Sequence, residues 1–293
     1  QFRRISMSKI LVTGGLGFVG SHLVDFLSNG ENEVTVIDNL CSESSSRSYM
    51  RDDVRYWVDD VRNLNTYKYS GENFDVVYHL AALARIQPSF KDPLNYLSID
   101  IMGTSNVLEF ARRVNAKVVY AGSSSAFGGP MLNPYAFAKY TGEQVCEMYH
   151  KVYGMSVVTA RFFNVYGDRQ PTTGAYATVV GIFENQCSTG LPLTVTGNGK
   201  QRRDFTHVSD IVSGLSALGE DTHSAEIYQL GTGKNYSINE LAKMFSEDIK
   251  YIDARPGEAW ITLADISDMK NKTGWHPQVS IEEYVENYLN NNL

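Results

Sequence analysis

The sequence of 293 residues is 43% hydrophobic, which suits one large folded domain or two modest ones and argues against global disorder. Its formal net charge of -7 argues against a nucleic-acid-binding surface, because phosphate binding needs clustered Lys and Arg. Three widely spaced cysteines form no CxxC pair and no apolar run approaches the roughly 18 residues of a membrane span, so we expect a reduced, cytoplasmic protein without a metal site or a membrane contact.

The first six residues, QFRRIS, lack the apolar stretch of a signal peptide, so we take Met7 as the natural start and residues 1–6 as an added leader. Short apolar runs then alternate with longer amphipathic segments. Strands are expected at KILVTG, EVTVID, VRYWV, FDVVYHLAA, AKVVYAGSS and SVVTARFFN, and helices at FVGSHLVDFLSNG, closed by Gly30, and DPLNYLSIDIMGTSNVLEFARRVN. This alternation predicts an α/β fold with a doubly wound parallel sheet of the Rossmann type.

From about Val165 onward the pattern is less regular and richer in glycine, which predicts a smaller C-terminal α/β domain for a substrate. The helical pattern HVSDIVSGLSALG is expected to return to the first domain. The predicted boundaries are 7–165 for the first domain, with returning segments near 205–232, and 166–204 with 233–293 for the second.

The first strand runs into TGGLGFVG, where Gly14, Gly17 and Gly20 open the first helix. Glycines here let the backbone turn tightly and approach a pyrophosphate, which the helix N-terminus also attracts. A tight strand–helix turn would explain the glycines as well. The second strand, however, ends in VIDN, and a carboxylate at Asp38 suits the ribose hydroxyls of NAD and would repel the 2′-phosphate of NADP.

Two further segments are candidates for the same site. Asp60, with Val61 after the third strand, could accept the adenine amino group, although a loop Asp explains it equally well. Alanines in HLAALA would let a cofactor lie against the backbone, although close packing also explains them. The predicted cofactor is NAD, and its site comprises Gly14, Gly17, Phe18, Val19, Gly20, Asp38, Asn39, Asp60, Val61, Leu80, Ala81, Ala82, Ala84, Tyr135 and Lys139.

Tyr135 and Lys139 lie one helical turn apart after Pro134, which suits the first turn of a helix. A free tyrosine has a pKa of about 10, and a neighbouring ammonium favours its phenolate. Lowering the pKa to about 7 requires roughly 4 kcal/mol, which Lys139 and a positively charged nicotinamide ring could supply in a dry site. Serines at the end of the fifth strand could then hydrogen-bond the reacting oxygen. The set predicts a general base beside a hydride acceptor.

The chain from Met7 onward resembles the extended short-chain dehydrogenase/reductase family, and within it the nucleotide-sugar 4-epimerases. The segments that match, in the family's order, are TGGLGFVGSH, VIDN, HLAALA, SSSAFG, PYAFAK, RFFNVYG, RRDFTHVSDI and RPGE. The resemblance implies that Tyr135 is the catalytic base and that Lys139 holds the nicotinamide ribose. Ser123 is the matching hydroxyl, with Ser124 as the alternative.

The same resemblance implies a substrate site. Asn164 would bind the substrate diphosphate, Arg203 and Arg255 would clamp it, and Glu258 would take the nucleotide ribose. Three features depart from the family pattern: only eleven residues separate Ser123 from Tyr135, Thr196 stands where relatives carry an aromatic, and Phe127 replaces a tyrosine. Because of the shortened rim and Thr196, the resemblance does not fix which nucleotide base or which sugar the substrate carries.

The residues after the active-site hydroxyl bear on the reaction. Related 4,6-dehydratases carry an Asp–Glu pair there and related decarboxylases a Glu, whereas this chain has Ser124 and Ser125. Return of hydride to a rotated 4-keto sugar, and hence C4 epimerisation of a UDP-hexose or UDP-N-acetylhexosamine, is the expected outcome. An enzyme for a GDP-, CDP- or dTDP-sugar and a non-catalytic NAD sensor are the alternatives.

Two last expectations come from the resemblance. Helices 92–114 and 135–153 carry apolar residues on more than one face, including Leu97, Ile101, Leu108 and Phe110, which predicts a four-helix interface in a homodimer. Thr262, seven residues after Arg255, is small where a large aromatic would restrict the pocket to plain hexoses, so 2-acetamido sugars should fit. Thr262 could instead be a β-branched residue of a strand, AWITLAD.

Overall fold

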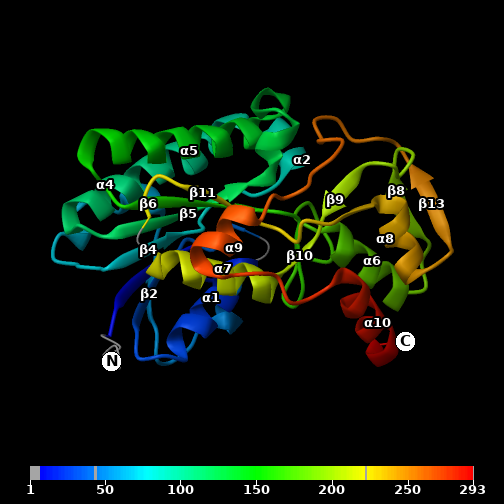
Figure 1. The fold of residues 1–293 in the computed structure, drawn as a ribbon, viewed down its shortest axis with the longest axis horizontal. Helices are drawn as coiled ribbons and strands as arrows, with labels where there is room; N and C mark the ends of the chain where they lie inside the picture. The colour runs from blue at the N-terminus through cyan, green and yellow to red at the C-terminus, as the bar shows by residue number, and fades with distance from the viewer. Residues whose placement is uncertain (1–6, 43–44, 222, 293) are drawn as a thin grey trace.

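The computed structural model describes residues 7–42, 45–221 and 223–292, so the expected leader lies outside the described residues. Its centre is a seven-stranded sheet in which every neighbouring pair is parallel (Figure 1). In sheet order the strands are β11 (Ile227–Leu230), β6 (Val157–Phe162), β5 (Lys117–Ser123), β4 (Val76–His79), β1 (Lys9–Thr13), β2 (Glu33–Asp38) and β3 (Arg55–Val58). The six strands expected from the sequence are all present, and the Rossmann-type fold is confirmed.

Helices cover both faces of this sheet, and the strands show why. Ile10 and Val12 of β1 belong to one hydrophobic cluster, and Leu11 between them belongs to the other, so both faces of the strand are buried. The helices α1 (Phe18–Ser28) and α7 (Val208–Glu220) lie on the first face, and α4 (Thr104–Val114) and α5 (Pro134–Tyr153) on the second (Figure 1). The predicted return of residues 207–219 to the first sheet therefore takes the form of α7 beside α1, followed by β11 at the sheet edge.

A third hydrophobic cluster, drawn from residues 166–289, forms a second unit at the right of Figure 1. Its small sheets pair β8 with β13, β9 with β12, and β7 with β10. These elements are β7 (Val165–Tyr166), α6 (Val179–Ser188), β8 (Leu193–Thr196), β9 (Arg202–Asp204), β10 (Thr206–His207), β12 (Asn235–Ser237), α8 (Ile238–Phe245), β13 (Ile249–Ile252) and α10 (Ile281–Asn292). The short helix α9 (Ser267–Thr273) packs with the first unit through Met269.

The predicted helix over residues 92–115 is interrupted. It consists of α3 (Pro93–Leu97), a π-helical segment (Ser98–Gly103) and α4, and follows the short α2 (Ile86–Lys91). Side chains of Thr104, Ser105 and Asn106 donate to the carbonyls of residues 100, 101 and 102 at 2.6–2.9 Å. Such back-bonding by polar side chains competes with the regular ladder and accompanies the wider turn.

Three details of the sequence prediction are wrong. The first helix ends at Ser28 with Asn29 as its cap, rather than at Gly30. Segment AWITLAD forms only an isolated bridge between Ile261 and Arg202, so Thr262 does not lie in a strand. Leu108 and Phe110 are fully buried inside the subunit and cannot contact a partner.

Within the described ranges, no helix combines the length and the apolar character that crossing a membrane would require.

Candidate active site

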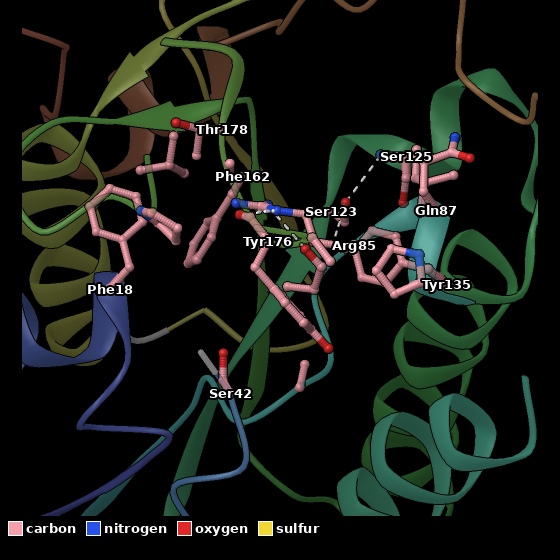
Figure 2. Close-up of a pocket in the computed structure, with 18 of the residues that line it drawn as sticks. Phe18, Ser42, Arg85, Gln87, Ser123, Ser125, Tyr135, Phe162, Tyr176 and Thr178 are labelled. Carbon is pink, nitrogen blue, oxygen red and sulfur yellow. Dashed lines mark hydrogen bonds between the residues drawn. The ribbon is translucent and has the colours of Figure 1, made fainter. Parts of the chain in front are cut away.

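One cavity of about 1000 Å³ lies at the carboxyl ends of the sheet strands and extends to the second unit (Figure 2). Ligands of doubly wound sheets bind in this position. Every site residue predicted from the sequence lines it, including those far apart in the chain, such as Gly14, Tyr135 and Thr262. The structure therefore brings the whole predicted set together.

The glycine turn is built for close approach. Gly14 has φ +71°, and a Cβ there would lie 2.8 Å from the backbone nitrogen of Ala81. A Cβ at Gly20 would lie 2.1 Å from the carbonyl oxygen of Gly14. Helix α1 has no side-chain cap at its N-terminus, which leaves amide groups to face an anion. This arrangement fits the pyrophosphate of a dinucleotide.

Asp38 is 7% exposed and fixed by backbone amides at the end of β2. Its Oδ2 accepts from the Leu16 amide at 3.0 Å and its Oδ1 from the Leu40 amide at 2.8 Å. Burial raises the pKa of this carboxyl, while the two amides act in the opposite direction. The Ser45 side chain also hydrogen-bonds this carboxylate, which keeps one acceptor position for a ribose hydroxyl.

Asp60 already accepts hydrogen bonds from two neighbouring side chains, which the sequence did not indicate. Arg62 pairs with it at 2.7 Å and Asn39 donates to it at 3.0 Å, and the hydrogen bonds from Arg62 lower the pKa of Asp60. Any further contact to an adenine amino group would share an oxygen that Arg62 or Asn39 already occupies.

The hydroxyl of Tyr135 donates to Ser123 Oγ at 3.2 Å. Pro134 and the cap Asn133, which accepts from the Ala136 amide at 2.7 Å, start α5 at this point and so aim Tyr135 at the end of β5. Of the two serines left open by the sequence, Ser123 is the one that forms this hydrogen bond.

Lys139 is buried one helical turn after Tyr135. Its Nζ donates to the Ala121 carbonyl at 2.8 Å, and no hydrogen bond joins it to the tyrosine. Burial raises the pKa of Tyr135, whereas Ser123 and the charge of Arg85 favour the phenolate. The charge of Asp100 acts in the opposite direction to that of Arg85, and the role expected of Lys139 beside a bound nicotinamide stays a prediction.

Asp100 was missed by the sequence analysis, although an acid inside an apolar helical pattern was a visible signal. It is 1% exposed and sits in the π-helical segment. Its Oδ1 accepts from the Leu83 amide at 2.8 Å, and its buried Oδ2 has no hydrogen-bond partner among the described residues. Burial raises its pKa to about 7, against the opposing charge of Lys139.

Arg85 and Ser125 were also missed. Both line the cavity near Tyr135 (Figure 2). Arg85 directly follows the alanines of HLAALA, and its position there was the available signal. Its Nε donates to the Tyr176 carbonyl at 2.6 Å, a contact between residues 91 positions apart that no local pattern reveals.

On the far side of the cavity, Arg203 is 9% exposed and pairs with Glu258 at 3.4 Å. Burial lowers the pKa of Arg203, and Glu258 opposes that shift. Asn164, at φ 28°, donates to Thr262 Oγ1 at 3.3 Å. Arg255 is exposed at the rim. Two cations at this end suit a diphosphate.

The glycine turn, the Asp38 carboxylate and the Ser–Tyr pair define a dinucleotide-binding α/β enzyme that moves a proton and a hydride. The chain belongs to the NAD dependent epimerase/dehydratase family, whose model matches residues 10–231. The predictions of the family and of NAD as its cofactor are thereby confirmed.

Known proteins agree with this assignment. A putative UDP-glucose 4-epimerase of Methanocaldococcus jannaschii is 32% identical over 96% of this chain and 97% of its own. The UDP-glucose 4-epimerase of Thermotoga maritima, solved with UDP-glucose, superposes with a TM-score of 0.90 at 28% identity, covering 97% of this chain and 99% of that one. The UDP-glucuronic acid 4-epimerase of Bacillus cereus, solved with UDP-glucuronic acid and NAD, gives 0.86 at 30% identity, with coverages of 97% and 99%.

Proposed function

We propose that the protein is an NAD-dependent 4-epimerase of UDP-sugars. The observation that carries the proposal is the hydrogen bond between Tyr135 and Ser123, placed in one cavity between the glycine turn and the Arg203 side. A protein that only sensed NAD would have no need of a half-buried base at this point. The similar structures that bind UDP-sugars support the same substrate class.

In this proposal Tyr135 takes the proton of the sugar 4-hydroxyl, and Ser123 orients that oxygen. When bound, NAD supplies reversible acceptance of the C4 hydride. Lys139 would hold the nicotinamide ribose. Arg203 and Arg255 would keep the diphosphate bound while the 4-keto sugar rotates to present its other face. Return of the proton from Tyr135 then completes the epimer.

The residues after Ser123 favour epimerisation over elimination. Ser124 and Ser125 provide hydroxyls, and neither supplies the acid–base pair that loss of water would need. Turnover of a GDP-, CDP- or dTDP-sugar is the alternative within the same machinery, because Thr196 lines the cavity without offering an aromatic face to a base.

We further propose a homodimer formed by α4 and α5. The π-helical segment that precedes α4 exposes Met102 (56%), and α5 exposes Met148 (42%) and Val152 (62%), an apolar surface that a second copy would bury. Light scattering at micromolar concentration should give twice the mass of the chain, and a monomer mass would contradict the proposal. The three free cysteines are consistent with a reduced, cytoplasmic setting.

The enzymatic proposal is tested by incubating the protein with UDP-glucose, UDP-N-acetylglucosamine, UDP-glucuronate, GDP-mannose, CDP-glucose and dTDP-glucose in separate reactions. Chromatography of the products should show C4 epimers from at least one UDP-sugar with no net consumption of NAD. Epimers from another nucleotide sugar alone would assign that nucleotide instead, and no epimer from any of them would refute the proposal.

A further inference from the structure

The cation beside the catalytic tyrosine lacks an acidic partner. Arg85 lines the cavity and is partly buried, and no carboxylate of the described residues forms an ion pair or a hydrogen bond with it. Burial lowers the pKa of Arg85, and the titratable groups around it are the phenols of Tyr96, Tyr135 and Tyr176, which are neutral near pH 7. A partly desolvated guanidinium without a counterion is costly, so an anion bound in the cavity would be favoured here.

Two hydrogen bonds hold the Arg85 guanidinium in place and leave some of its N–H donors unused. Its Nε donates to the Tyr176 carbonyl at 2.6 Å, and its Nη1 donates to the Ala84 carbonyl at 3.0 Å. An arginine has five N–H donors, and Nη2 makes no hydrogen bond to any residue in the described ranges. The anchored fork can therefore present charge-assisted donors to a planar carboxylate.

A second unsatisfied group lies in the same part of the cavity. Ser125 Oγ is buried and has no hydrogen-bond partner among the described residues, while the Ser125 amide donates to Ser123 Oγ at 3.2 Å. Figure 2 draws Arg85, Ser125 and Tyr135 together in this cavity. A buried hydroxyl without a partner is costly, and an additional acceptor supplied by a ligand would remove that cost.

The position of Tyr135 limits which part of a sugar can supply the anion. If Tyr135 takes the proton of the 4-hydroxyl, the substituents nearest to it are those on the neighbouring carbons. In a hexuronate, the C6 carboxylate is attached to C5, directly next to C4. The substrate diphosphate is attached at the opposite end of the sugar, where Arg203 and Arg255 lie in the proposed mode.

We infer that Arg85, assisted by Ser125, binds the carboxylate of a UDP-hexuronate, so that the favoured substrate is an anionic sugar rather than a neutral hexose. This inference rests on the proposed 4-epimerase function and names its substrate. The side chain acts by binding, and the proton and hydride steps remain those described above.

The test compares UDP-glucuronate with UDP-glucose in the NAD-loaded enzyme. Wild type should have a kcat/KM at least about tenfold higher for UDP-glucuronate, as expected for one charge-assisted contact. Arg85→Gln should lower kcat/KM for UDP-glucuronate on the order of 50-fold and for UDP-glucose less than about threefold. Arg85→Lys should recover part of the loss, and Ser125→Ala should lower only the uronate value, about threefold. Lys270→Gln, which removes an exposed charge from α9, is the matched control.

The possible outcomes distinguish failure of carboxylate binding by Arg85 from failure of the proposed epimerase function. Equal losses for both sugars in Arg85→Gln would mean that Arg85 acts through Tyr135 or the fold, and would overturn the inference. Turnover of UDP-glucose without turnover of UDP-glucuronate would also overturn it and leave the epimerase function intact. Loss of carbon dioxide from UDP-glucuronate, seen by mass spectrometry and dependent on Arg85, would support carboxylate binding and overturn epimerisation.

Discussion

Replacing Asp100 with Asn should change how the stability of the protein depends on pH. Burial raises the pKa of this carboxyl from 3.8 to about 7. Because the folded-state pKa is the higher one, the protonated carboxyl stabilises the fold at low pH, and this stabilisation is lost as the pH rises through 7. The two pKa values correspond to a loss of about 2.5 kcal/mol in the free energy of unfolding between pH 5 and pH 8.

Asn can still accept the hydrogen bond from the Leu83 amide but has no proton to lose. The stability of Asp100→Asn relative to wild type should therefore rise by about 2.5 kcal/mol between pH 5 and pH 8. Urea unfolding of both proteins at pH 5, 6, 7 and 8 with saturating NAD measures this difference, in which the other titrating groups cancel. Parallel curves for the two proteins would refute the reasoning, because Asp100 would then titrate alike in the folded and unfolded states.

Three further predictions concern the site. In Tyr135→Phe, kcat should fall at least about 100-fold because the main proton acceptor is gone, while fluorescence titration should show that NAD still binds. If the variant keeps more than about a tenth of kcat, another group accepts the proton. Cofactor-stripped protein should bind NAD at least about tenfold more tightly than NADP, because a 2′-phosphate would face the buried Asp38 carboxylate, and equal binding would contradict that role. UDP-N-acetylglucosamine should be epimerised with a kcat/KM within about tenfold of that for UDP-glucose. Thr262→Tyr should lower kcat/KM selectively for the acetylated sugar, whereas Thr262→Val, which replaces the hydroxyl with a methyl group of similar size, should not. An unchanged preference in Thr262→Tyr would remove Thr262 from the sugar pocket.

The sheet could be predicted from the sequence because its strands are buried on both faces and carry continuous apolar runs. Ile10, Leu11 and Val12 are each at most 4% exposed. Apolar runs of this kind, separated by amphipathic helices, are compatible with few folds other than a parallel sheet covered by helices on both faces. The glycine turn could also be predicted from the sequence, because Gly14 and Gly20 occupy positions where a side chain would collide with the backbone.

What could not be predicted depends on contacts between distant segments. The apolar, β-branched segment AWITLAD has the composition of a strand, yet only Ile261 forms a bridge to Arg202. Tertiary surroundings decided that outcome against local propensity. Likewise, Lys139 donates to the Ala121 carbonyl, and Arg85 donates to the carbonyl of Tyr176, which lies 91 residues away in the chain. Sequence spacing placed Lys139 and Tyr135 on one helix face and could not show that Arg85 also lines the cavity beside them.

The order of the strands has a consequence for synthesis of the chain. Strand β11 pairs with β6, although 64 residues of the second unit and α7 separate Phe162 from Ile227 (226 − 162). A ribosome that has released the first 165 residues has therefore delivered an incomplete sheet, with one edge of β6 unpaired and one face without α7. An unpaired edge of this kind is prone to pairing with other chains. The nascent protein is thus most exposed to misassembly while the second unit is still being made, and a truncation near residue 165 should yield an aggregating fragment instead of a free NAD-binding domain.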